Sequence, residues 1–307
     1  MFILDPDPYS QPAYRIGPFQ TRDLSFNHSL PRNDRIDSYL SERFGNRYYI
    51  YTVNGRSAIN IALSLCRLAR NDVVTIFTTS GNFYISSCVT NEIDKFCRWS
   101  RDILPETKLI FVIHEFGYPF INIRRLKEFN LPIIEDCAGS FFSDDKDHTI
   151  GRIGDFVIYS FPKMFPLQVG GCLVSQFSDI EYHSGSLKYE IRQYIKNVLS
   201  EYISDKDHII NQRIVNYLKL KSRFGSLGLH QRFDLTDGIV PGVFMFRTDS
   251  YHFDLSELKK HFWAHGIHSS VFYGETAFFI PVHHSLGESD LDYFYEVMRL
   301  FIQRQTI

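Results

Sequence analysis

Apolar and polar residues alternate with two different periods along the middle of the chain. Short runs rich in β-branched and aromatic residues are typical of strands, and they occur at 48–53, 73–77, 108–114, 131–135, 155–161 and 171–175. Apolar residues at helical spacing predict helices at 58–69 and 121–129. Strands that alternate with helices predict an α/β fold, with a mostly parallel sheet covered on both faces. Such sheets bind ligands beyond the carboxyl ends of their strands.

The pattern changes on either side of this region. Residues 1–35 are rich in Pro, Asp, Asn and Arg with little periodicity, which predicts an irregular N-terminal arm. After residue 184, charged helical stretches and two short strands are predicted, at 187–203, 209–221, 243–247, 255–265 and 267–272, with a last amphipathic helix at 291–302. We therefore expect a large α/β domain at 36–184 and a smaller α+β domain at 185–307.

Composition and charge exclude several classes of partner. The 307 residues carry 33 Lys and Arg against 35 Asp and Glu, a net charge of −2. This balance provides no broad basic field for nucleic acid or for an anionic membrane. The longest apolar runs have the length of strands, and the N-terminus lacks the basic start and apolar core of a signal peptide. We therefore expect a cytoplasmic protein that binds neither nucleic acid nor membrane.

The five cysteines form no close pair in the sequence. An odd number without close spacing argues against a disulfide framework, so we expect free, buried thiols at Cys66, Cys88, Cys97, Cys137 and Cys172.

The first candidate site lies where a strand meets a helix. Asn54-Gly55 is a turn signal, and Arg56 and Ser57 open the helical pattern that follows it. A helix N-terminus beside a glycine presents free N–H groups to an anion, and Arg56 and Ser57 add side-chain donors. The alternative is an ordinary helix cap without a ligand.

The second and third candidates follow later strands. Asp136 ends the buried strand at 131–135, where a carboxylate can pair with a cationic ring nitrogen; the alternative is a solvent-facing loop cap. Lys163 follows the strand at 155–161 and has Phe, Pro and Met neighbours, which favour a lysine that is desolvated in a cleft and nucleophilic toward carbonyls. The alternative is a solvated surface lysine.

Together these three groups are what pyridoxal 5′-phosphate (PLP) requires: an anion cradle, an aspartate for the ring nitrogen and a lysine for the aldehyde. Five segments resemble landmarks of the DegT/DnrJ/EryC1/StrS family of sugar aminotransferases, in the family's order: Gly55-Arg56-Ser57-Ala58-Ile59, Ile113-His114-Glu115-Phe116-Gly117-Tyr118-Pro119, Ile134-Glu135-Asp136-Cys137-Ala138, Gly151-Arg152-Ile153-Gly154-Asp155, and Ser160-Phe161-Pro162-Lys163 with Gly170-Gly171. The resemblance implies the PLP-dependent fold type I and a homodimer.

The resemblance also implies roles for individual residues. Lys163 would bind the cofactor covalently and move a proton during transfer, and Asp136 would keep the pyridine nitrogen protonated. The phosphate would be bound by Gly55, Arg56, Ser57 and Ser160, and the ring would stack on Phe83 or Tyr84. For these two aromatic residues the alternative is plain helix packing.

Some positions depart from the family's pattern. Gly139 stands where the family has Gln, and the gap from Ser160 to Lys163 is shorter than usual. The stretch from Phe96 to Thr107 is also short, and no segment resembles the one that reaches across the family's dimer interface. These differences concern substrate contacts more than cofactor contacts.

Two groups of histidines are further candidate sites. His261, His265 and His268 have a spacing that zinc sites use, but no Glu accompanies them as in a metalloprotease motif, so we predict no metal. His283 and His284 lie in a segment similar to a loop of the family's small domain, and a structural loop is favoured over a catalytic one because no partner carboxylate can be identified.

The leading hypothesis is a PLP-dependent aminotransferase that converts a nucleotide-linked keto sugar to an amino sugar for surface polysaccharides, with glutamate as the expected donor. The second hypothesis keeps the cofactor but changes the reaction or takes a small keto compound. The third is a non-catalytic scaffold that has lost the cofactor. An NAD-binding Rossmann protein is disfavoured because no Gly-x-Gly-x-x-Gly opens the first helix.

Overall fold

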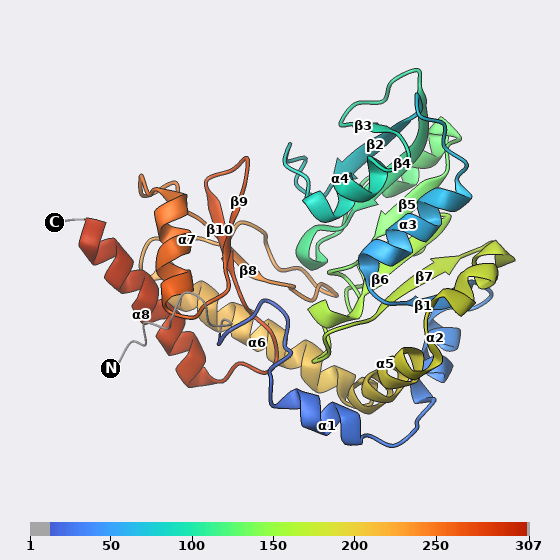
Figure 1. Cartoon of the computed structure of the whole chain (residues 1–307). Coiled ribbons are helices and arrows are strands. Elements are labelled where there is room, and N and C mark those ends of the chain that lie inside the picture. The colour runs from blue at the N-terminus through green and yellow to red at the C-terminus, as the bar shows by residue number, and fades with distance from the viewer. Residues whose placement is uncertain (1–12, 306–307) are drawn as a thin grey trace.

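The computed structural model describes residues 13–305 and divides into a large and a small lobe (Figure 1). A seven-stranded sheet forms the centre of the large lobe, in the order β1-β7-β6-β5-β4-β2-β3. Its strands are β1 (Tyr48–Thr52), β2 (Val73–Thr78), β3 (Arg98–Ser100), β4 (Thr107–Ile113), β5 (Ile133–Asp136), β6 (Phe156–Ser160) and β7 (Gly171–Ser175). The strands from β6 to β3 are parallel to one another, and β7 pairs antiparallel with both β6 and β1, so β7 alone runs against the other six strands of this sheet. The predicted α/β fold with a mostly parallel sheet is thus confirmed.

Helices cover both faces of this sheet because alternate residues of its strands are apolar on each side. One face packs on α3 (Gly55–Leu65) and α4 (Ser87–Ile93) through residues such as Ile134, Ile158 and Leu173. The other packs on α2 (Arg35–Phe44) and α5 (Tyr189–Tyr202) through Val157 and Val174. Short 3-10 turns connect these elements, at Glu115–Gly117, Ile123–Phe129, Phe161–Lys163, Ser178–Ser186 and Ile203–Asp205.

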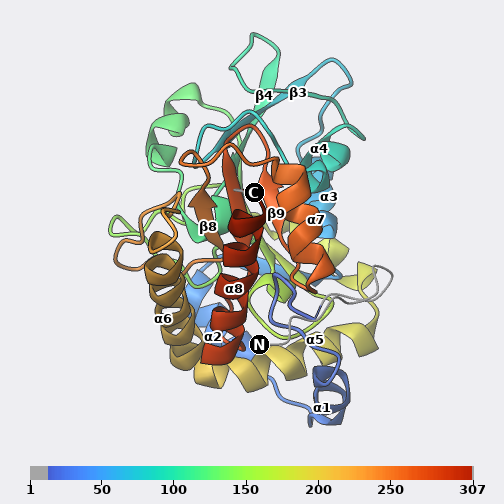
Figure 2. The same cartoon turned by 90° about the vertical axis from the view of Figure 1, so that its left-hand side faces the viewer.

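The small lobe is built on a three-stranded antiparallel sheet. Its order is β8-β10-β9, formed by β8 (Phe244–Arg247), β9 (Ser270–Phe272) and β10 (Ala277–Ile280). One face packs on the helices α6 (Lys206–Gly225), α7 (Leu255–Ala264) and α8 (Glu288–Gln305), which Figure 2 shows with α8 in front of the strands. The opposite face meets Phe116 of the large lobe.

The two lobes do not divide at the residue suggested by the sequence pattern. Leu187, the core residues of α5 and Ile209 of α6 belong to the core of the large lobe, whereas Tyr217 of α6 belongs to the core of the small lobe. The change of core therefore falls within α6, which runs continuously from one lobe to the other (Figure 1).

The N-terminal arm is more ordered than the sequence pattern predicts. It contains the helix α1 (Asp23–Ser29), and Tyr14 forms a β-bridge with Ile267 of the small lobe. The prediction of an irregular arm is therefore wrong for α1, and its first 12 residues lie outside the described part of the chain. None of the helices between residues 13 and 305 has both the length and the apolar character needed to cross a membrane.

Candidate active site

Asp136 and Ser160 lie on the same face of the sheet, at the carboxyl ends of neighbouring strands. Asp136 pairs with Ile158 across β5 and β6, and Ser160 follows Ile158 by two residues. Since side chains alternate along a strand, both residues point to the side that α3 covers. The spacing of adjacent strands, about 4.8 Å, keeps the two groups close together. Two of the residues predicted from the sequence are therefore brought to one place.

The carboxylate of Asp136 is buried but not fully used. Oδ1 accepts a hydrogen bond from the amide of Ala138 at 2.8 Å, and Oδ2 accepts none from residues 13–305. Only 8% of the residue is exposed, so the alternative of a solvent-facing loop cap is wrong. The bond to Ala138 fixes the orientation of the carboxylate while one oxygen remains for a further donor.

The N-terminus of α3 approaches the same spot. Asn54 caps the helix by accepting from the amide of Ser57 at 2.9 Å, and its Oδ1 also accepts from the Ser57 hydroxyl at 3.2 Å. Gly55 lies directly against Ser160, since a Cβ added to Gly55 would stand 3.3 Å from the Ser160 Cβ. The glycine thus allows the first turn of α3 to come close to the end of β6.

Several donors at this point are unused. The first amides of a helix have no partner within the helix, which leaves those of Gly55 and Arg56 available. Ser160 and the Arg56 guanidinium take part in no side-chain hydrogen bond or ion pair with residues 13–305. Together with the positive end of the helix dipole, these donors suit a phosphate. The Ser57 hydroxyl contributes less than expected because its proton faces Asn54.

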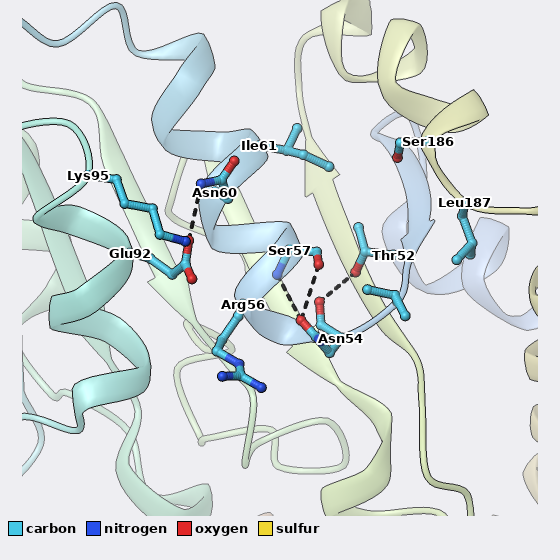
Figure 3. A pocket seen from close by; sticks show the side chains of 11 residues that line it. Thr52, Asn54, Arg56, Ser57, Asn60, Ile61, Glu92, Lys95, Ser186 and Leu187 are labelled. Carbon is cyan, nitrogen blue, oxygen red and sulfur yellow. Dashed lines mark hydrogen bonds and ion pairs between the residues drawn. The ribbon is translucent and has the colours of Figure 1, made fainter.

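A hollow of about 510 Å³ lies along the outer side of this helix start (Figure 3). Arg56, Ser57 and Asn60 line it from α3, and Glu92 and Lys95 line it from the region of α4. Glu92 is already paired with Lys95 at 2.6 Å and accepts from Asn60 at 3.1 Å, so it does not neutralise Arg56. Arg56 is exposed here and keeps its charge available for an anion.

Lys163 ends the 3-10 turn that follows β6. Its neighbours Phe161, Met164 and Phe165 are buried, but the lysine itself is exposed in the single chain. The expectation that apolar neighbours desolvate Lys163 is therefore wrong for the isolated chain: they pack into the core beneath the loop and leave the side chain outside. Its backbone is held, because the Lys163 carbonyl accepts from the Arg213 guanidinium at 2.9 Å.

The two aromatic candidates lie in a loop before α4. Phe83 is 77% exposed, and Tyr84 is 44% exposed with its ring 5.1 Å from that of Tyr273 in the small lobe. Neither belongs to a helix, so the alternative of helix packing is wrong. Tyr84 contacts the small lobe, whereas the exposed ring of Phe83 is available to contact another molecule.

Gly139 follows Asp136 by three residues and faces the turn after β4. A Cβ added at Gly139 would lie 3.4 Å from the Cα of Phe116, at the boundary between ordinary and tight van der Waals contact. The backbone of Phe116 therefore occupies the space beside this position.

Glu135 is a second acidic residue, next to Asp136, for which the sequence predicts no role. Glu135 is fully buried on the opposite face and accepts from Nε2 of His114 at 2.9 Å and from the amide of Gly151 at 2.7 Å. Burial opposes the charge of Glu135, but the bonds from His114 and the Gly151–Gly154 turn outweigh it and lower the pKa of the carboxyl. Nδ1 of His114 accepts from the amide of Phe120, which leaves the ring proton on Nε2.

His114, Glu135 and Cys137 also lie close enough together to be considered as metal ligands. Each nitrogen of His114 is used in a hydrogen bond, and both carboxylate oxygens of Glu135 accept backbone amides. Burial raises the pKa of the Cys137 thiol well above its ordinary range, which disfavours the thiolate that binds metals. This cluster is therefore better explained as an internal hydrogen-bond network.

The remaining candidate histidines contact backbone carbonyls, and the cysteines form no disulfide within residues 13–305. Nε2 of His261 and Nδ1 of His265 lie within hydrogen-bond distance of backbone carbonyls, and His283 contacts the carbonyl of Arg15. All five cysteines are free, as expected. Only three of them are buried: Cys66 is partly exposed and Cys88 exposed, so burial was predicted wrongly for these two.

The arrangement as a whole suits a ligand with an anionic end and a cationic ring nitrogen. The α3 amides and Ser160 would take the anion, and Oδ2 of Asp136 would take the ring nitrogen. A phosphorylated pyridine such as PLP has this pattern of groups.

Comparisons with known proteins show the family of this chain. A family model described as "Putative PLP-dependent aminotransferase" matches residues 36–231, more than half of the chain. A "Putative L-glutamine:3-amino-2,3-dideoxy-scyllo-inosose aminotransferase" from Micromonospora echinospora is 26% identical over 183 residues, 52% of this chain and 44% of that protein. A dTDP-4-amino-4,6-dideoxy-D-glucose transaminase from Shigella dysenteriae is 24% identical over 185 residues, 54% of this chain and 50% of that protein.

The chain spans about half the length of these curated relatives. The likeness of fold extends further. The crystal structure of a DegT DnrJ EryC1 StrS aminotransferase from Brucella abortus matches with a TM-score of 0.69, covering 91% of this chain and 93% of that chain at 16% identity. The fold expected from the sequence motifs is thereby confirmed. Since the family model spans the sheet, α3, Asp136 and Lys163, the chain belongs to this family of PLP-dependent aminotransferases.

Proposed function

We propose that this protein is an aminotransferase that uses PLP to move an amino group onto a ring ketone. The observation that carries the proposal is the meeting of the α3 N-terminus, Ser160 and Asp136 on one face of the sheet, directly before Lys163. Each group has unused hydrogen-bonding capacity, which a purely structural cluster would have no reason to leave.

Each residue then has a defined task. The amides of Gly55 and Arg56, the Ser160 hydroxyl and the Arg56 side chain bind the phosphate. Oδ2 of Asp136 accepts from the ring nitrogen and keeps its proton in place. Nζ of Lys163 would hold the aldehyde of the cofactor and would be the group that moves a proton at the amino-bearing carbon. Bound PLP supplies the electron sink for that carbon.

The relatives and the sequence motifs support a proposal for the substrate class. The two curated relatives are named for substrates that carry amino groups on six-membered rings, an inosose and a dideoxyglucose. We propose a nucleotide-linked keto sugar as acceptor and L-glutamate as donor, with an amino sugar for surface polysaccharides as product. L-glutamine, the donor in the name of one relative, is the first alternative to test.

A homodimer belongs to the same proposal. Lys163, Phe83 and Arg56 are assigned to the cofactor site and are exposed in the single chain, whereas an active site of this kind has to be covered. A second copy that covers this edge would exclude water from the reaction. Sedimentation at several concentrations tests this point, and a protein that stays monomeric while active contradicts it.

The central experiment measures cofactor binding and amino transfer separately. Purified protein is titrated with PLP while its visible absorbance is followed, and is then incubated with ¹⁵N-labelled L-glutamate or L-glutamine and a panel of keto-sugar nucleotides. Label recovered in the sugar by mass spectrometry supports the proposal. Absence of any absorbance change with PLP would reject it and favour a scaffold without cofactor.

Binding of PLP without transfer to any sugar would favour the second candidate, a PLP enzyme with another reaction or a small keto substrate. The short stretch from Phe96 to Thr107 and the partial coverage of the relatives are the observations that keep this candidate open. The same labelled donors with small keto acids and keto polyols distinguish it.

A further inference from the structure

The loop that carries Lys163 is held from three separate parts of the chain. The Arg213 guanidinium of α6 donates to the Lys163 carbonyl at 2.9 Å. Asn27 of α1 donates to the carbonyl of Pro166 at 2.7 Å. Gly17 lies so close to the loop that an added Cβ would stand 2.3 Å from the Pro162 carbonyl oxygen. The backbone of Lys163 is thus fixed although its side chain is exposed.

Arg213 is the unusual member of this set. Its side chain is completely buried, and no carboxylate among residues 13–305 forms an ion pair with it. Its charge is stabilised by two backbone carbonyls, those of Lys163 and of Pro241 at 3.2 Å, and its Nε has no partner. Burial lowers the pKa of Arg213 to about 9, so that the group remains protonated at neutral pH.

The surroundings of Arg213 add no negative charge. Burial and the charge of Arg213 lower the pKa values of His283 and His284. An imidazole ring is neutral or positively charged, so neither histidine is a counter-ion to Arg213. A buried cation without a partner costs stability, and an apolar side chain of similar volume is often equally or more stable at such a position.

Filling space therefore does not explain an arginine at this position, but the bond to Lys163 does. We propose that Arg213 is a positioning residue: it fixes the carbonyl end of the Lys163 turn so that Nζ can reach the aldehyde of PLP bound at Asp136 and α3. The hydrogen bonds of Arg213 connect α6 to the carbonyls of Lys163 and Pro241. They therefore also link the lysine loop to the segment that leads into β8 of the small lobe. This inference rests on the proposed function.

The test compares two forms of the cofactor. PLP has an aldehyde that bonds to the lysine, whereas pyridoxamine 5′-phosphate (PMP) has the same ring and phosphate but no aldehyde. For Arg213→Met, we expect the dissociation constant of PLP to rise about tenfold, equivalent to about 1.4 kcal/mol, while that of PMP changes by less than about twofold. Arg213→Lys, which keeps the charge and one donor, should fall between this variant and the wild type.

Asn216→Leu is the matched control. Asn216 lies one turn further along α6, is equally buried, and donates to the carbonyls of His283 and Leu286 without contacting the lysine loop. We expect it to lower the unfolding temperature and to leave the ratio of PLP to PMP affinity unchanged. If Arg213→Met does not fold, Arg213→Lys alone should still show a changed ratio.

Two results would overturn the inference. Equal weakening of PLP and PMP binding in the Arg213 variants would show a general structural role, and unchanged binding of both would show no role. Failure of the proposed function gives a different result, because the wild-type protein would then bind neither PLP nor PMP.

Discussion

Glu135 and Asp136 are neighbours in the sequence, both buried, and they point to opposite faces of the same strand. Both carboxylate oxygens of Glu135 accept hydrogen bonds, from His114 and from the turn at Gly151–Gly154. Asp136 uses one oxygen for Ala138 and keeps the other unused within the described chain. The protein therefore satisfies both carboxylate oxygens of Glu135 but only one of the two oxygens of Asp136.

The difference separates structural chemistry from binding chemistry. A fully bonded carboxylate on the α2 and α5 face stabilises the fold and has no capacity left for a ligand. A half-bonded carboxylate on the α3 face lies beside free helix amides and the unused Ser160 hydroxyl. Unused polar atoms gathered at one edge of the sheet therefore identify the site better than the amount of buried charge does.

Lys163→Ala is the substitution with the largest expected effect on turnover and cofactor binding, the functions assigned to the α3 face. Without Nζ the protein loses its covalent bond to the cofactor and the proton carrier, so turnover should be abolished and the visible band of bound PLP should shift to that of free cofactor. Absorbance spectra and labelled transfer assays measure both effects. If both survive the substitution, another lysine performs this role.

Asp136→Asn tests the half-bonded carboxylate. The amide can still accept from Ala138, so the unfolding free energy should change little, but the ring nitrogen loses its ionic partner. We expect turnover to fall about 10²-fold, in the range found when one stabilising charge is removed from a reaction site. Steady-state rates and denaturant unfolding should be measured on the same preparation, and wild-type turnover would remove the assignment.

Glu135→Gln should reverse this pattern. The new NH₂ group cannot accept the hydrogen bonds that the lost oxygen accepted, and His114 is left without its ionic partner. Breaking this buried network should cost about 3 kcal/mol of unfolding free energy. Protein that remains folded should bind PLP nearly as tightly as wild type. Weaker PLP binding with unchanged stability would contradict the division between the two faces.

A drop in pH has the smallest expected effect on stability, and it extends the comparison to buried histidines. Burial and the charge of Arg213 lower the pKa of His284 to about 3, against about 6.5 in an unfolded chain. Above pH 6.5 both states are neutral, and below it the unfolded state binds a proton that the folded state does not. Stability should therefore fall as the pH drops below about 6.5, by less than about 1.4 kcal/mol per pH unit for this group.

His284→Asn should make that loss of stability shallower, and urea unfolding at several pH values measures it. His114 is the natural contrast, because its bond to Glu135 gives it a partner that His284 lacks. A variant with the same pH dependence as wild type would show that His284 does not resist protonation.

The sequence predicted the large features because they depend on local periodicity. The alternation of strands and helices, the strand before Asp136 and the cap at Asn54 all follow from residues within one element. It missed β3 and β10, which have three and four residues and too little pattern to stand out. It also missed three helices: α1, whose sequence has no clear apolar face, and α2 and α4.

Other properties depend on contacts between distant residues. The bond from Arg213 to Lys163 joins positions 50 residues apart, and nothing near Arg213 in the sequence distinguishes it from a surface arginine on a charged helix. The exposure of Lys163 also depends on distant contacts, because its apolar neighbours could either cover the lysine side chain or pack into the core. Only the packing of Phe161 and Phe165 into the core decides between these outcomes.

The pairing of Tyr14 with Ile267 has a consequence for the order in which the chain assembles. This β-bridge and the packing of Tyr14 on Phe294 link an early segment to one more than 250 residues later. Contacts that close so large a loop gain nothing until both partners exist, so they form late in folding. Because Gly17 follows in the same segment, the lysine turn should acquire its final support only after the small lobe has folded.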